Sequence, residues 1–528
     1  MNNVEILITS DRTMITNHHG KEFLGFIATA PPIVLPEFLW MYLCCPRPKV
    51  DEFGRPLEAP YGLRKIEATL QNAGFSAYII DPDYLEKYVD SAKILMIGHH
   101  DFFAFGPPSS EWWLLTKKEP INRRSFIKLM ESKPVRAMKK KGVKIVVGGP
   151  AAWQWLWEPE LVDKWGIDLI IEGEAEKVIV DLTQKLLNNE AVPKYVSVGA
   201  KEVPSIDEIP LIKAPSVNGL IEITRGCPRG CRFCSVTLRP LRHIPIDRVI
   251  KEIDVNISNG LMHVILHSED VLLYGASGVE PNPDAVMKLH AEVAKKVKGS
   301  IDSLAWAHAS LAAIVYSQRK YKLITNVSDI IYSDIGQEYL GVEVGIETGS
   351  PRMAKMIMPA KAAPFKPEEW PDIVEEAFAI MHEHRIVPAA TFILGFPGEE
   401  PDDVLKTVEL LDRLKNYRSI IVPMIFVPMG ALKGSEGGIT GLKFSAEHAE
   451  AMRVAFWHTI KWAEDIMNNF YLRKKAYAPL RLLLKVFIWY AKQKVSKIEK
   501  TLLPQLETKE LSLLSSGGKD ILTPTCVE

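Results

Sequence analysis

Short apolar runs, separated by stretches with helical spacing, dominate the first 200 residues of the chain. Residues 63–74, LRKIEATLQNAG, carry apolar residues three and four apart and stop at Gly74, which predicts a helix. Runs with the composition of buried strands cover residues 23–30 and end at Asp81, Gly98, Gly149 and Gly173. This alternation predicts an α/β fold with a doubly wound parallel sheet over residues 1–200, in which ligands bind beyond the carboxyl ends of the strands.

A Pro-containing segment at residues 201–216 predicts a linker to a second α/β region at residues 217–441. Strand-like runs such as HVILH and GVEVGIE alternate there with helical stretches such as PDDVLKTVELLDRLK. The series is long enough for about six units, so we expect a partial (β/α)6 barrel. Residues 442–528 follow as a helical C-terminal region. A chain of 528 residues has room for these parts at about 100 to 200 residues per domain.

The charges of the chain nearly cancel, with 64 Lys and Arg against 65 Asp and Glu. Without a global positive field, a dedicated binder of RNA or DNA is disfavoured. The N-terminal segment has no basic stretch followed by a long apolar one, and no apolar run reaches about 18 residues. We therefore expect a cytoplasmic protein, with attachment to a membrane face left open.

Residues 479–500, PLRLLLKVFIWYAKQKVSKIEK, combine large apolar residues with several Lys and Arg residues. Two interpretations of this segment stay open. It is either a packed C-terminal helix or a basic helix that makes peripheral contact with anionic lipid.

Three cysteines, Cys227, Cys231 and Cys234, crowd into the motif GCPRGCRFC after a predicted strand. A loop this short can wrap a compact inorganic cluster. A four-iron four-sulfur cluster normally takes four thiolates, so three local ligands leave one iron open unless a distant cysteine supplies the fourth. The alternative is a zinc site, which needs a fourth ligand such as His243.

The spacing Cys-x-x-x-Cys-x-aromatic-Cys, with Phe233 as the aromatic residue, resembles the signature of the radical S-adenosylmethionine (radical SAM) enzymes. The resemblance implies that the three cysteines are the catalytic, metal-binding residues that hold a 4Fe-4S cluster. It implies that the open iron binds S-adenosylmethionine, whose reductive cleavage gives a 5'-deoxyadenosyl radical. An electron donor such as ferredoxin or flavodoxin is then expected, and the backbone of Phe233 would contact the adenine.

Three later segments extend the resemblance. GIETGSPRMAKMI is similar to a family segment that lies near S-adenosylmethionine, and ILGFPGEEPDDV resembles the segment that closes over its adenine. HSEDVLLYG is similar to a strand end whose acidic residue reaches the cofactor. The resemblance assigns these cofactor contacts to Glu347, Ser350, Gly395, Pro397 and one of Glu269 and Asp270.

The first region resembles the cobalamin-binding domain that precedes the radical domain in one large subgroup of the family. The matching segments are APYGLRKIEATLQNAGFSAYIID, GVKIVVGGPAA and GIDLIIEGEAEKVIVDL. Glycines let the backbone approach a large planar ligand. The resemblance places the cobalamin pocket at Gly148, Gly149, Pro150, Gly173 and Glu174.

One departure concerns the lower axial ligand of cobalamin. The motif Asp-x-His-x-x-Gly, which supplies a histidine ligand in many cobalamin proteins, occurs nowhere in the chain. Either cobalamin binds without a histidine from this motif, or the sheet no longer binds it. His99 and His100 follow a predicted strand end, and each is either a group facing the cofactor or a structural loop residue.

The two cofactors together suggest the reaction. The adenosyl radical makes a carbon radical, and methylcobalamin can deliver a methyl group to it, so we expect C-methylation of an unactivated carbon on a hydrophobic or natural-product-like small molecule or lipid. Ring formation or skeletal rearrangement of a membrane lipid is the alternative within the family. A noncatalytic cobalamin and iron-sulfur sensor is the alternative of another class. Methylthiolation of tRNA is disfavoured because no basic appendage is present.

Overall fold

The computed structural model describes residues 4–20, 23–32, 36–472, 475, 478–497, 499–500 and 510–513. Within this part, the chain forms two compact units. The first contains residues 4–221 and 247–263, and the second contains residues 222–246 and 264–513. The finer division predicted at residues 200, 216 and 441 stays a prediction.

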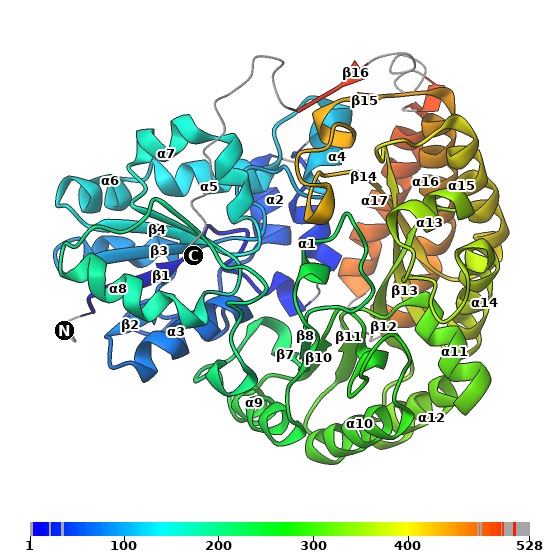
Figure 1. Cartoon of the computed structure of the whole chain (residues 1–528), viewed down its shortest axis with the longest axis horizontal. Helices are drawn as coiled ribbons and strands as arrows, with labels where there is room; N and C mark the ends of the chain where they lie inside the picture. Colours follow the sequence, from blue (N-terminus) through cyan, green and yellow to red (C-terminus); the bar gives the residue numbers. More distant parts are fainter. Residues whose placement is uncertain are drawn as a thin grey trace. The chain divides into compact units, whose positions relative to one another are not determined.

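Six parallel strands form one sheet in the first unit. Their spatial order is β2-β1-β3-β4-β5-β6, so the direction in which the chain crosses the sheet reverses between β1 and β3. Helices lie on both faces of the sheet, with α3 and α8 on one and α5, α6 and α7 on the other (Figure 1). The strands are β1 (Ile6–Thr9), β2 (Ala77–Ile79), β3 (Ile94–Gly98), β4 (Lys144–Gly148), β5 (Leu169–Glu172) and β6 (Tyr195–Ser197). The helices of this unit are α1 (Phe23–Ala28), α2 (Glu37–Cys44), α3 (Tyr61–Asn72), α4 (Ser109–Thr116), α5 (Ile121–Met130), α6 (Lys133–Lys140), α7 (Pro159–Trp165), α8 (Ile179–Leu187) and α9 (Ile246–Ser258).

The helix α3 follows the predicted pattern, because its apolar side chains meet the sheet. Leu63 and Leu70 pack with Ile6 and Ile8 of β1 in a buried cluster that also takes in Leu182 of α8. In contrast, the apolar run at residues 23–30 forms α1 rather than a strand. A short apolar run fits a buried helix as well as a strand, so periodicity alone could not separate the two.

The strands of the second unit form the partial barrel. They pair in the orders β11-β10-β7 and β12-β13-β14, and a parallel bridge from His308 to Glu343 links the end of β11 to β12. Helices lie outside these strands (Figure 1). The strands are β7 (Leu220–Glu222), β10 (His263–His267), β11 (Ser303–Trp306), β12 (Leu340–Glu347), β13 (Ile386–Leu394) and β14 (Ile420–Ile425). The helices are α10 (Pro283–Val297), α11 (Leu311–Tyr321), α12 (Leu323–Ile330), α13 (Pro351–Ile357), α14 (Trp370–Glu383) and α15 (Pro401–Arg413).

Two helices, α16 (Ala446–Ile466) and α17 (Ala478–Lys497), follow the barrel, and β15 (Leu442–Lys443) pairs with β16 (Glu510–Leu511). These features confirm the predicted fold class of doubly wound sheet, partial barrel and helical C-terminal region.

On one face of α17, Ile488 packs against Met467, while Leu482, Val486 and Trp489 are exposed. Among the described helices, none is both long and apolar enough to cross a bilayer. Contact of this helix with lipid stays a prediction.

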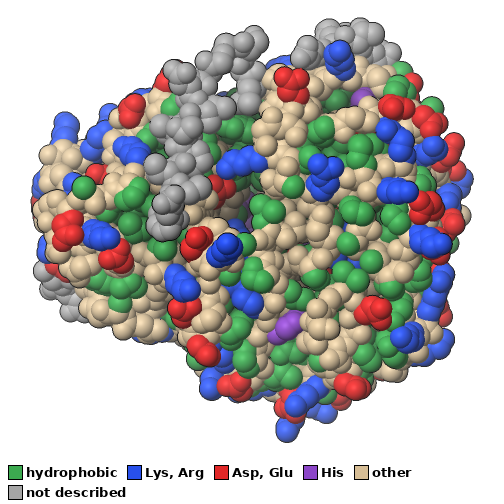
Figure 2. Space-filling model, viewed as in Figure 1, with side chains coloured by type: hydrophobic (Ala, Val, Ile, Leu, Met, Phe, Trp, Pro, Cys, Tyr) green, Lys and Arg blue, Asp and Glu red, His purple; other side chains and the backbone are tan. Residues whose placement is uncertain are grey.

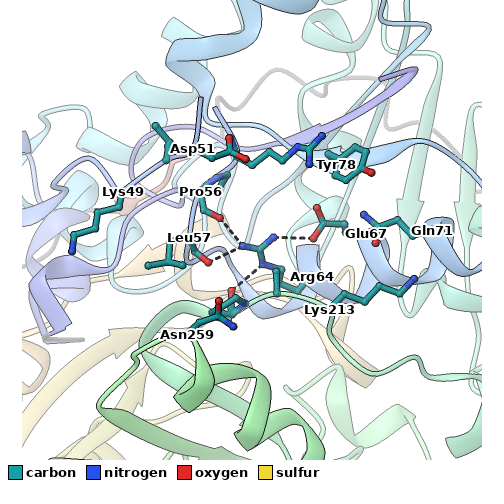
Figure 3. A pocket seen from close by; sticks show the side chains of 14 residues that line it. Lys49, Asp51, Pro56, Leu57, Arg64, Glu67, Gln71, Tyr78, Lys213 and Asn259 are labelled. Atoms are coloured by element: carbon teal, nitrogen blue, oxygen red, sulfur yellow. Dashed lines mark hydrogen bonds and ion pairs between the residues drawn. The ribbon is translucent and has the colours of Figure 1, made fainter. Parts of the chain in front are cut away.

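A buried arginine ties three segments of the first unit together. Arg64 of α3 donates to the carbonyl oxygens of Pro56 at 2.8 Å, Leu57 at 3.0 Å and Pro215 at 2.9 Å, and to a carboxylate oxygen of Glu67 at 2.8 Å. It lines a cavity of about 540 Å³, in which the close-up of Figure 3 shows these bonds converging on one guanidinium. None of the residues predicted to bind a cofactor lines this cavity. We interpret it as a structural contact between the segments that Arg64 joins.

We expect Arg64→Gln to lower the free energy of unfolding by about 3 to 5 kcal/mol, because it leaves Glu67 buried without its cation. The other oxygen of Glu67 accepts the amide of Ile79, so the loss reaches β2. The matched control is Lys213→Ala, an exposed residue of the same cavity. Urea unfolding followed by circular dichroism measures both, and equal midpoints for the two variants would contradict the assignment.

Candidate functional site

The three cysteines lie in a loop that is closed by a short antiparallel ladder. β8 (Thr224–Arg225) pairs with β9 (Arg242–His243), so the loop returns to its own start. Gly226 begins the loop at φ 80°, where a side chain would run into the carbonyl oxygen of Pro240. Only glycine is tolerated at this position. Cys227 follows it and therefore lies next to the paired strands β8 and β9.

The backbone of the cysteine loop is fixed from two sides. Thr237 Oγ1 donates to the carbonyl oxygens of Cys231 at 3.0 Å and Cys234 at 2.9 Å. From the other side, Gly430 approaches so closely that a Cβ atom would lie 2.7 Å from the carbonyl oxygen of Cys234 and 2.8 Å from that of Arg232. Contacts within the protein therefore hold the backbone of the loop from both sides.

Arg229, between the first two cysteines, is buried and anchors the loop. Its guanidinium pairs with Asp270 at 3.0 Å, and it donates to the carbonyl oxygens of Lys361 and Ala363, both at 3.1 Å. Asp270 follows β10, so the loop is tied both to a strand end and to the segment after α13.

A second cation, Lys361, is partly buried beside the thiols and pairs with Glu347. Burial alone would lower the pKa of Lys361, but the charges of Glu347 and Cys231 outweigh it and raise this pKa. Glu347 ends β12 at φ 62°, and its Oε2 is buried without a hydrogen-bond partner among the described residues. An acceptor oxygen is thus available next to the cysteine loop.

Burial raises the pKa of Cys227 to about 11 and that of Cys231 to about 12, and it raises the pKa of Cys234 as well. Positive charge on Arg229 and Lys361 acts in the opposite direction and favours the thiolates. Metal binding requires thiolates, so two cations beside three thiols suit an anionic cluster.

The structure argues against a zinc site, because the predicted fourth ligand, His243, already makes hydrogen bonds within the protein. His243 Nε2 donates to the carbonyl oxygen of Ala276 at 2.9 Å, and its Nδ1 accepts the amide of Gly275 at 3.1 Å. Both ring nitrogens are therefore committed. Within the part of the chain that is described, no three Cys, His, Asp or Glu side chains are already grouped to hold a single metal ion. Ligation by Cys227, Cys231 and Cys234 stays a prediction.

The predicted adenine contacts lie side by side. The ring of Phe233 is 5.4 Å from that of Phe396, which is 5.5 Å from Phe426. Phe396 is flanked by Gly395 and Pro397 in the loop after β13, so this loop adjoins the last turn of the cysteine motif. Phe396 and Phe426 are buried, so the partly exposed ring of Phe233 is the one of the three that can contact a planar base.

Of the other residues predicted to contact S-adenosylmethionine, some have side chains that are already bonded within the protein. Ser350 is fully buried, caps α13 and donates to Asp403 at 2.5 Å, so its hydroxyl positions the turn after β12. Asp270 is held by Arg229, whereas Glu269 is half buried and has no hydrogen bond to the described residues. Of the two acids after β10, Glu269 is the one available to a ligand.

Sequence reasoning missed a polar cluster at the ends of β10 and β11. His308 Nε2 pairs with Glu343 Oε2 at 3.0 Å, with both side chains about 40% exposed, and the ring of His267 lies 6.4 Å away. Burial alone would lower the pKa of His308, but the hydrogen bond and charge of Glu343 raise it to about 9. The barrel therefore presents an imidazolium and a carboxylate.

The predicted cobalamin contacts gather at one edge of the first sheet. Gly148 ends β4 and is followed by Gly149 and Pro150, and Gly173 and Glu174 follow β5, its parallel neighbour. Gly149 has φ 107°, and a Cβ atom there would lie 2.8 Å from the carbonyl oxygen of the residue after β3. Close packing against the backbone after β3 is therefore enough to require glycine at position 149.

Residues 221–411 match the family model of the Radical SAM superfamily. This part of the chain is a radical SAM domain. The match contains the cysteine loop, Arg229, Lys361, Glu347 and the Phe396 loop.

Curated relatives of the radical SAM domain are distant. The chain is 22% identical over 52% of its length to a tRNA-2-methylthio-N(6)-dimethylallyladenosine synthase from Vesicomyosocius okutanii, covering 58% of that protein. It is 26% identical over 49% of its length to an uncharacterized methyltransferase from Pyrococcus horikoshii, covering 52% of it. The chain thus spans about half the length of these relatives.

Among solved structures, the radical S-adenosylmethionine methyltransferase TsrM from Kitasatospora setae has a similar fold. The likeness covers 81% of this chain and 77% of TsrM, with a TM-score of 0.50 and 14% identity. That TsrM structure holds cobalamin and a [4Fe-4S] cluster. A second TsrM structure, with tryptophan and a SAM analogue, gives a TM-score of 0.51 at 12% identity.

We expect Arg229→Gln to lose most of its iron after anaerobic reconstitution, because the loop of the radical SAM domain loses its anchors and Asp270 keeps an unpaired buried charge. Arg232→Gln is the matched control, since Arg232 is exposed in the same loop. Iron and sulfide per chain are measured in both. A folded Arg229→Gln protein with the iron content of the control would contradict the role of Arg229.

The pair in the barrel predicts a pH dependence. The pKa of His308 in the folded protein is raised above the ordinary value of 6.5. The stabilisation of the fold by the pair of His308 and Glu343 is therefore complete below about pH 6.5 and is lost as the pH rises through about 9. Magnetic resonance of isotope-labelled histidine should show the ring titrating near 9, and Glu343→Gln should lower that value. His290, whose pKa burial lowers to about 4, is the internal reference. An unshifted His308 in Glu343→Gln would contradict the pairing.

Proposed function

We propose that the protein is a cobalamin-dependent radical SAM enzyme that generates a 5'-deoxyadenosyl radical and methylates an unactivated carbon. The observation that carries the proposal is the cysteine loop held by contacts within the protein, with Arg229 buried and Lys361 partly buried beside its thiols, inside a radical SAM domain. The fold likeness to TsrM supports it, because that likeness covers most of the chain and not the radical SAM domain alone.

When bound, a cluster with one open iron supplies an electron to S-adenosylmethionine, and cobalamin supplies a methyl group. The protein's own residues position and enclose these reactants. Arg229 and Lys361 offset negative charge at the thiolates, and the unpartnered Oε2 of Glu347 accepts a hydrogen bond from a ligand donor. The partly exposed ring of Phe233, which packs on Phe396, would keep water from one face of the adenine.

The polar cluster of the barrel narrows the class of substrate. His308 and Glu343 offer one donor and one acceptor within a half-exposed pair, so the substrate carries at least one polar or charged group as well as the carbon to be methylated. A purely hydrocarbon lipid fits this pair poorly, because it would displace water from both charged groups and offer neither of them a hydrogen bond. An electron donor such as ferredoxin or flavodoxin is part of this proposal.

Methylthiolation of tRNA is the second candidate, and the names of the curated relatives favour it. The charge of the chain weighs against it. Basic and acidic side chains are interspersed over the face seen in Figure 2, and the formal net charge is −1. Binding of a polyanion relies on clustered Lys and Arg side chains.

The test is anaerobic reconstitution with iron, sulfide and cobalamin, followed by addition of S-adenosylmethionine and a reductant. We expect 5'-deoxyadenosine from the wild-type protein and none from Cys231→Ala, because a cluster needs all three local thiolates. Cys44→Ala is the matched control, since Cys44 is buried in a different part of the chain. Mass spectrometry detects the product.

Each outcome separates the candidates. Absence of 5'-deoxyadenosine with every electron donor, from protein that retains its cluster, would favour the sensor over the enzyme. With substrate candidates present, a mass gain of one CH2 supports methylation, and a loss of two hydrogens supports ring formation. Methylthio-modified adenosine in added tRNA would establish the second candidate and contradict the first.

A further inference from the structure

We propose that His100 supplies the protein ligand to the cobalt of bound cobalamin, from a position outside the Asp-x-His-x-x-Gly motif that this chain lacks. The inference rests on the proposed function, because it requires that the first unit binds cobalamin. It settles which of the two adjacent histidines, His99 and His100, has a structural role and which is free to bind a ligand.

The position of His100 follows from the strand order of the sheet. Because the order is β2-β1-β3, the connections leaving β1 and β3 diverge to opposite faces of the sheet. In open α/β sheets, ligands bind at this point, beyond the carboxyl ends of the strands. β3 ends at Gly98, so His99 and His100 are the first two residues beyond that end.

His99 is fully used by the fold. Its Nε2 pairs with Asp11 Oδ2 at 2.6 Å, and its Nδ1 accepts the amide of Asp101 at 2.7 Å. The other oxygen of Asp11 accepts both the amide and the hydroxyl of Thr13 at 2.7 Å. This buried pair clamps the loop after β1 to the loop after β3, and it leaves His99 no nitrogen for a metal.

His100 differs from His99 in both exposure and hydrogen bonding. Its side chain is exposed, and among the described residues neither ring nitrogen has a hydrogen-bond partner. Its one aromatic contact is with His99, whose ring centre lies 5.3 Å away. The clamp on His99 therefore fixes the backbone at His100 while the imidazole stays open, and neutral imidazole is the commonest protein ligand to metals.

Other potential ligands in the first unit are less suitable. His18 Nδ1 donates to the carbonyl oxygen of Cys44 at 2.6 Å, and its remaining nitrogen, Nε2, packs so closely on Gly25 that a Cβ atom there would lie 3.3 Å from it. The thiols of Cys44 and Cys45 are buried, and burial raises the pKa of both, so they stay protonated. His19 is exposed and has only a 3.4 Å contact with the carbonyl oxygen of Tyr42, which makes it the matched control.

The experiment uses full-length protein containing histidine labelled with nitrogen-15, loaded with cobalamin and reduced to the cob(II)alamin state. Electron paramagnetic resonance then identifies the axial nitrogen. We expect a doublet splitting from the labelled imidazole in the wild-type protein and in His19→Gln. His100→Ala and His100→Gln should lose the doublet but keep cobalamin, measured by its absorbance after gel filtration.

The outcomes separate this inference from the function on which it rests. A triplet from the cofactor's own unlabelled base, no nitrogen splitting, or a doublet that survives in both His100 variants would overturn the role of His100 while leaving cobalamin binding in place. A wild-type protein that retains no cobalamin would overturn both the role of His100 and the cobalamin part of the proposed function.

Discussion

Three thiols in one short loop, one of them buried and two partly buried, become thiolates only where positive charge and a fixed backbone compensate for the loss of water. Arg229 and Lys361 provide that charge, and the loop is fixed by a β-ladder, by Thr237 and by the close approach of Gly430. The same contacts bring the ends of β10 and β12 to the loop, because Arg229 pairs with Asp270 and Lys361 with Glu347. The ends of two barrel strands thus meet at this charged junction.

Parallel strands explain why the remaining groups converge. In each unit the carboxyl ends of neighbouring strands share an edge, so residues far apart in sequence meet there. The edge of the first sheet gathers the glycines after β4 and β5 and the histidines after β3. The barrel edge gathers His308, Glu343 and Glu347.

The sequence predicted those parts whose signal is local. The cysteine spacing, the helix ending before Gly74 and the strand ending at Gly149 each lie in one short stretch, and the structure has them in the expected elements. Arg229 could not be found in this way, because its partner Asp270 lies 41 residues away, and Gly430 could not, because its role comes from a close backbone approach. Lys361 pairs with Glu347, 14 residues away, and no local spacing marks that pair. The run at residues 23–30 was assigned to the wrong element, since a short apolar segment carries no period that separates helix from strand.

The most direct test of the account is the spin-resonance spectrum of the reduced cluster in oxygen-protected protein, recorded with and without S-adenosylmethionine. An iron corner left free by three thiolates predicts a four-iron signal that changes on addition, with coupling to nitrogen-15 placed in the amino group of the cofactor. Protein that holds zinc, or a four-iron signal that the cofactor leaves unchanged, would contradict it.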